Sequence, residues 1–123
     1  MAGYTQAYAQ TTLDANHPTS ANGDHIAYST NGSSEATTVF TRTPIGATGW
    51  AAATAAQPSV KANNAILTSA AAGAAGTVTH FAVFSAITGG TQKTDWTALT
   101  ASRTVAINDT LQWAIGALAI TMD

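Results

Sequence analysis

The stretch that decides the fold class is residues 77–87, TVTHFAVFSAI, in which side chains alternate without interruption between the two sides of an extended segment. Phe81 falls on one side of this segment and Phe84 on the other. A strand with aromatic residues on both sides has packed neighbours on both faces. We therefore predict that residues 77–87 form a central β-strand.

Short strands separated by turn signals continue from this stretch to residue 123. After the turn sequence TGGT at 88–91, short apolar runs predict strands at 95–100, 103–107, 111–115 and 118–122. Short and evenly spaced strands are typical of an all-β fold, an antiparallel β-sandwich or a barrel-like domain. The predicted core consists of Val78, Phe81, Val83, Phe84, Val105, Ile107, Leu111, Trp113, Leu118 and Ile120.

The first part of the chain is less regular. Alternation and β-branched residues predict strands at 24–30 and 36–43. Residues 4–16 contain no Gly or Pro and place Tyr4 and Tyr8 four positions apart, on one face of a short helix. We expect residues 1–23 to be an N-terminal arm or short helix, and residues 24–123 to form a single β domain.

Composition excludes several classes of partner. Only 8% of the residues are charged, the net charge is −2, and the four basic residues are not clustered, so we expect no binding to nucleic acid or to an anionic membrane. The chain has no cysteine, which excludes disulfides and zinc-thiolate sites. No apolar run is long enough to span a bilayer, and no signal-peptide pattern begins the chain, so we expect synthesis in the cytoplasm.

The low charge also indicates how the surface is used. Ala (28 residues) and Thr (22 residues) supply 50 of the 123 positions, so much of the surface is small and uncharged. Such a surface leaves few unpaired charges when it is buried, which suits lasting contact with another protein. The alternative is a Thr-rich β domain that is weakly charged for no functional reason.

The sequence contains no recognisable catalytic or metal-binding pattern. His17, His25 and His80 do not have metal-ligand spacing, the six carboxylates are scattered, and no phosphate-binding glycine motif is present. Three tryptophans could form a carbohydrate platform, although in so small a protein tryptophans more often anchor a core or an interface. We expect no catalytic residue, no cofactor and no metal, and a protein that is not an enzyme.

Two C-terminal segments carry a family resemblance. Residues 76–90, GTVTHFAVFSAITGG, and residues 98–123, ALTASRTVAINDTLQWAIGALAITMD, resemble a family of small bacteriophage virion structural proteins, whose members are labelled as tail fibre, minor capsid or decoration proteins. Upstream, residues 12–14 are similar to the N-terminal helix of that family and residues 24–35 to its first strand and loop. The resemblance implies a β fold and a location in the virion, assembled in the host cytoplasm.

We weigh three functions, of which the first two are structural roles in the virion and the third belongs to another class. The first is a capsid decoration (cement) protein, a homo-oligomer and most plausibly a trimer, that binds the major capsid protein and stabilises the shell; its candidate interface residues are Tyr4, Tyr8 and Leu13. The second is a tail fibre or minor tail component. The third is a carbohydrate-binding module or a small hydrolase. The sequence lacks heptads, collagen triplets and β-helix repeats, which favours decoration over a fibre.

Overall fold

The structure is a computed structural model that describes residues 5–17, 24–45, 50–56 and 59–122. The chain divides into two compact units, each assembled from segments that are far apart in the sequence. Among the described residues, unit 1 comprises 5–17, 45, 50–56, 59–67 and 113–122, and unit 2 comprises 24–44 and 68–112.

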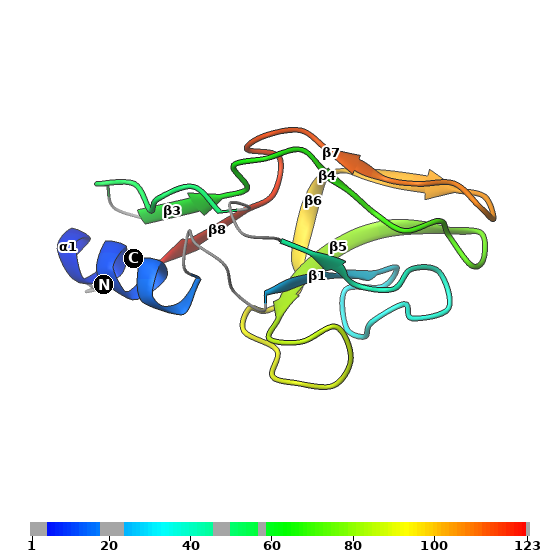
Figure 1. Ribbon diagram of the computed structural model, residues 1–123, viewed down its shortest axis with the longest axis horizontal. Helices are drawn as coiled ribbons and strands as arrows, with labels where there is room; N and C mark the ends of the chain where they lie inside the picture. The colour runs from blue at the N-terminus through cyan, green and yellow to red at the C-terminus, as the bar shows by residue number, and fades with distance from the viewer. Residues whose placement is uncertain (1–4, 18–23, 46–49, 57–58, 123) are drawn as a thin grey trace. The chain divides into compact units, whose positions relative to one another are not determined.

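Unit 2 is built on a four-stranded antiparallel sheet. Its strands, in spatial order, are β2 (Thr43–Pro44), β1 (His25–Ser29), β5 (Gly76–Phe84) and β6 (Thr97–Val105). The stretch with the strongest alternation forms β5, which lies between β1 and β6, so the predicted central strand is confirmed. Figure 1 shows β1 running alongside β5. The predicted all-β class, with antiparallel sheets and one N-terminal helix, is also confirmed.

The core of unit 2 is packed against β1 and β5. Ile26 and Val83, which are paired across the two strands, are both fully buried. The ring of Tyr28 lies 5.3 Å from that of Phe40, centroid to centroid, and the Tyr28 hydroxyl shares a 2.6 Å hydrogen bond with the hydroxyl of Thr43. This bond satisfies the polar end of a buried aromatic side chain and ties β2 to the sheet.

Strand β6 forms one edge of this sheet, and its pairing with β5 is interrupted by a bulge. Val78 of β5 pairs with Arg103, and His80 pairs with Ala98, so a single residue of β5 lies opposite four residues of β6 (99–102). The two strands predicted at 95–100 and 103–107 are thus one interrupted strand. A bulge disrupts the ladder at a sheet edge and hinders pairing with a further strand there.

Unit 1 contains the helix α1 (Gln6–Asn16) and the two-stranded antiparallel sheet of β3 (Ser59–Ala62) and β8 (Ala119–Met122). Thr5 caps the helix, because its side-chain oxygen accepts a hydrogen bond from the amide of Tyr8. Ala9 and Leu13 of α1 are buried. The helix packs against β3 and β8 (Figure 1). The predicted N-terminal helix is present and packs within its own unit.

A second two-stranded sheet pairs β4 (Leu67–Thr68) with β7 (Gln112–Trp113), and each of these strands has one residue in either unit.

The structure corrects further details of the prediction. Eight of the ten predicted core residues are buried, but Ile107 is 62% exposed and Phe84 is only partly buried. Ile107 lies in a turn that follows β6, where the alternating pattern no longer applies. Residues 36–43 form no continuous strand, because the amides of Val39 and Phe40 both donate to the carbonyl of Ala36 and close a turn.

An ion pair between Asp14 and Lys61 joins α1 to β3. The Lys61 side chain is fully buried and its Nζ lies 2.6 Å from Asp14 Oδ1, which also accepts the amide of Ala53 at 2.9 Å. Burial by itself would raise the pKa of Asp14, but the hydrogen bonds from Lys61 and Ala53 and the ammonium charge outweigh it and hold that pKa below its ordinary value. The pair therefore favours the folded state wherever Asp14 is ionised.

Substitution of Asp14 by Asn should lower the free energy of unfolding by about 1–3 kcal/mol, because it leaves a buried ammonium without a counter-charge. The effect stays below that of a fully buried pair, since the Asp14 side chain is 41% exposed and water can partly replace it. Urea denaturation measures the change, and the double variant Asp14→Asn/Lys61→Met should recover most of it.

The same variant has a defined pH dependence. Because the pKa of Asp14 is lower in the folded than in the unfolded protein, its stabilisation is complete above the unfolded value and disappears as the pH falls through the folded value. The difference in stability between wild type and Asp14→Asn should therefore shrink below about pH 4. A difference that persists unchanged at lower pH would show that the charge of Asp14 is not its source.

Candidate functional site

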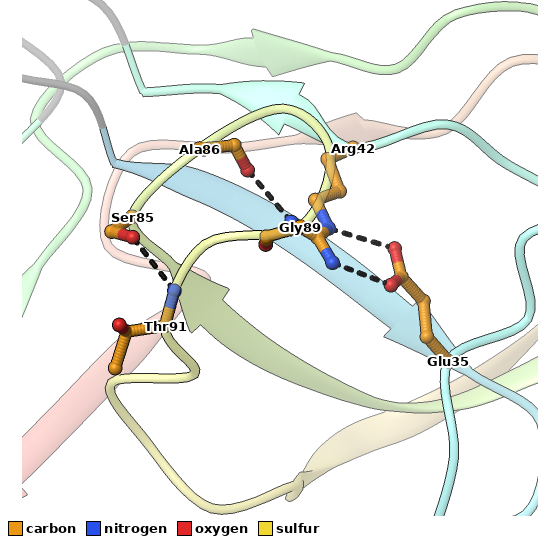
Figure 2. Close-up of polar contacts among 6 residues, drawn as sticks. All are labelled: Glu35, Arg42, Ser85, Ala86, Gly89 and Thr91. Atoms are coloured by element: carbon orange, nitrogen blue, oxygen red, sulfur yellow. Dashed lines mark hydrogen bonds and ion pairs between the residues drawn. The ribbon is translucent and has the colours of Figure 1, made fainter.

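The candidate site in unit 2 is centred on Arg42, whose side chain is only 7% exposed. Its Nε and Nη2 donate to the two carboxylate oxygens of Glu35, at 2.9 and 2.8 Å. Its Nη1 donates to the carbonyls of Ala86 at 2.8 Å and Gly89 at 2.7 Å (Figure 2). One guanidinium thus joins the segment that precedes β2 to the loop that follows β5, and most of its donors are satisfied.

An aromatic pair lies beneath the guanidinium. The Cζ atom of Arg42 is 3.8 Å from the centre of the Phe84 ring, and the Phe84 and Trp96 rings are 6.1 Å apart, centroid to centroid. A guanidinium over a ring face gains from the ring quadrupole, and more so when water is excluded. Phe84 is therefore partly buried because one face of its ring packs against Arg42, and its ring does not lie in the centre of the core.

The loop held by Arg42 is closed by its own hydrogen bonds. The amide of Ser85 donates to the carbonyl of Thr91 at 3.0 Å, and the amide of Thr91 donates to the Ser85 hydroxyl at 2.8 Å (Figure 2). Gly90 has a φ of +70°, and a Cβ there would lie 2.7 Å from the Ser85 hydroxyl oxygen. A residue with a side chain could not take this position without shifting the loop.

Beside the ion pair lies a hollow of about 430 Å³. Ile87, which is 55% exposed, and Phe40 supply its apolar wall. The hollow is lined by Glu35, Thr37, Phe40, Thr41, Arg42, Ile87, Thr88 and Gly89. Each oxygen of the Glu35 carboxylate accepts a hydrogen bond from Arg42, so the hollow combines an apolar wall with a neutralised ion pair.

Comparison with known proteins places the chain in a family. A sequence model of the podophage GP4 fiber I protein gp80 family matches residues 4–121. The chain belongs to this family. No curated protein matches the chain.

The gp80 family is a family of phage structural proteins, so the chain is a structural protein of the phage virion. This confirms the resemblance to small phage virion proteins that the C-terminal segments carry. A structural family also agrees with the expectation of a protein that is not an enzyme.

The three predicted interface residues, Tyr4, Tyr8 and Leu13, differ in their exposure and in whether the structure describes them. Tyr4 lies outside the described residues. Tyr8 is 58% exposed on α1, whereas Leu13 is 4% exposed and packs inside unit 1. The two residues therefore do not form one surface, and contact of any of the three with another chain remains a prediction.

The other candidate side chains are placed as follows. The ring of His17 meets that of buried Trp50 edge-on at 5.6 Å, and His80 Nδ1 shares a 2.8 Å hydrogen bond with the neighbouring hydroxyl of Thr79. Trp50 and Trp113 are both buried, so they cannot form an exposed platform with Trp96. Within the described ranges, no three His, Asp or Glu residues gather where they could hold a metal ion, and no helix is long and apolar enough to cross a membrane.

Sequence reasoning missed the site at Arg42. The available signal was the opposite charge of Glu35 and Arg42 on either side of a short segment, in a chain that has only ten charged residues. The carbonyls of Ala86 and Gly89 could not be anticipated, because they lie 44 and 47 positions away along the chain.

Replacement of Arg42 by Lys should reduce the free energy of unfolding by about 1–3 kcal/mol, because an ammonium cannot bind both carboxylate oxygens and both loop carbonyls. Amide hydrogen exchange in residues 85–91 should become faster in this variant. Arg103→Lys, the same change at an exposed position of β6, is the comparison variant and should lower stability less than Arg42→Lys does. Equal effects of the two substitutions would contradict a special role for Arg42.

Proposed function

We propose that this chain is a structural subunit of a virion fibre, which it joins through stable, non-covalent contact with other virion proteins. The observation that carries the proposal is the match of the fiber I family over residues 4–121, almost the whole sequence. The proposal needs no chemistry at the Arg42 site. It assigns that site to holding a surface loop in one conformation.

The distribution of charge supports this role. The chain has four basic residues, and Arg42, Lys61 and Lys93 are each engaged in an ion pair with a carboxylate of the same chain. Their charges are largely neutralised inside the protein. A surface with so little net charge loses little solvation energy on burial, so wide contacts with neighbouring proteins are favourable.

Capsid decoration is the second candidate, in which a homo-oligomer, most plausibly a trimer, binds the major capsid protein. Two observations favour it: the chain folds into two compact β-rich units, and its sequence lacks the repeats of elongated fibres. A decoration protein would also benefit from many weak contacts that act together on a regular lattice.

Electron microscopy of purified particles labelled with a gold-conjugated antibody against this chain separates the two candidates. The proposal predicts gold at the fibres, because a fibre subunit occupies only those positions. Gold distributed over the shell would favour decoration and reject the fibre assignment. Particles that bind no antibody after mild opening, and whose digests contain no peptide of the chain by mass spectrometry, would contradict both.

A further inference from the structure

The loop that follows β1 contains an Asn–Gly pair, Asn31–Gly32. In such a pair the backbone nitrogen of the glycine can attack the side-chain carbonyl carbon of the asparagine, least hindered because glycine has no Cβ. A bond forms between that nitrogen and Cγ, the bond from Cγ to Nδ2 breaks, and ammonia leaves with the proton that the backbone nitrogen gives up. Water then opens the cyclic succinimide to aspartate or isoaspartate. Asn31 is exposed, so water has access to it.

The fold requires a glycine at position 32. Its φ is +77°, a conformation that residues with a side chain rarely adopt. A Cβ added there would lie 2.8 Å from Cε1 and 2.9 Å from Nε2 of His80, which pairs with Ser29 across β5 and β1. The conformation that the loop takes over His80 therefore brings with it the asparagine sequence that is most prone to cyclise.

Ser29, which is fully buried at the end of β1, holds the attacking nitrogen. Its Oγ accepts the amide of Gly32 at 2.9 Å and that of Asn31 at 3.2 Å. A backbone nitrogen becomes nucleophilic only after it loses its proton, and a hydrogen-bonded amide gives up its proton mainly from locally opened states. The Ser29 hydroxyl therefore keeps the Gly32 nitrogen in its protonated, unreactive form.

The side chain of Asn31 is held as well. Its Oδ1 accepts the amides of Ser33 at 2.9 Å and Ser34 at 3.0 Å. The same oxygen accepts the Ser29 hydroxyl at 3.1 Å, and Nδ2 donates to Ser34 Oγ at 3.2 Å. Ring closure would bring Cγ to bonding distance of the Gly32 nitrogen, and this movement strains or breaks the bonds at both ends of the amide.

We propose that Asn31 is a latent modification site, protected from deamidation while Ser29 holds the Gly32 amide and reactive when the loop opens. The inference goes beyond the proposed function and is the same for a fibre subunit and a decoration protein. It matters for a virion protein, because a particle outside its host cannot replace its subunits by new synthesis. Deamidation adds a negative charge, and isoaspartate also lengthens the main chain by one carbon, which would displace Gly32 from His80.

The first test compares the rate of deamidation in the folded chain with the rate in the chain unfolded by urea, at one pH and temperature. Tandem mass spectrometry of the tryptic peptide of residues 1–42 distinguishes Asn31 from Asn16 and Asn22, which lie in the same peptide. Asn31 should react about tenfold or more slowly in the folded chain, because the reaction waits for the loop to open. Equal rates would overturn the proposal. A faster reaction in the folded chain would also overturn it, since the donors to Oδ1 would then be assisting the attack.

The second test removes the acceptor. Ser29→Ala should raise the rate at Asn31 in the folded chain about tenfold, together with the rate of hydrogen exchange at the Gly32 amide. Ser33→Ala is the matched control, because it removes a 3.1 Å hydrogen bond to Asn31 Oδ1 and leaves the Gly32 amide bonded to Ser29. Its rate should stay close to that of the wild type. Equal acceleration by the two substitutions would contradict control of the reaction by the Gly32 amide.

A further variant separates opening of the loop from loss of overall stability. Ile26→Val, in the same strand as Ser29, removes one methylene from a fully buried side chain and leaves the bonds of the loop in place. The free energy of unfolding is measured for both variants. A rate at Asn31 that rises in Ser29→Ala beyond the change in stability supports the proposal, and a rate that follows stability alone in both variants overturns it.

Discussion

The internal neutralisation of charge is the constraint on which the rest of the structure depends. Lys61 with Asp14, Arg42 with Glu35, and Lys93 with Asp24 at 2.5 Å use three of the four basic residues in pairs that join separate segments of the chain. Asp24 is 1% exposed and Lys61 fully buried, so each would be costly to leave unpaired. These ion pairs therefore connect separate segments of a chain that has no cysteine.

The sequence was sufficient to predict the central strand of the sheet but not the polar side-chain contacts between distant segments. The alternation of residues 77–87 predicted the central strand, because a strand packed on both sides needs apolar residues in both registers. The same pattern failed at Ile107 and Ile115, where a positive φ at the following residue turns the chain and exposes the side chain. The bonds of Asn63 to Ala114 and Leu118 cross more than 50 positions, and no local pattern reports such a contact.

Side chains that hold loops and turns in one conformation are the main functional feature of the described residues. Arg42 uses its guanidinium to hold a loop, and Asn63 uses its side-chain amide to hold a turn. Preorganised and weakly charged surfaces favour lasting association, as the proposed role in the virion requires. The bulge in β6 fits the same logic, since it hinders uncontrolled pairing at a sheet edge.

The central claim is that the chain is retained in the virion by burial of uncharged surface. The most direct measurement is the fraction of the chain that stays with purified particles as the salt concentration is raised from about 0.05 M to about 1 M, a range over which screening removes most interactions between exposed charges. The account predicts that the retained fraction hardly changes with salt and falls only when urea is added. Progressive release by salt alone would contradict it.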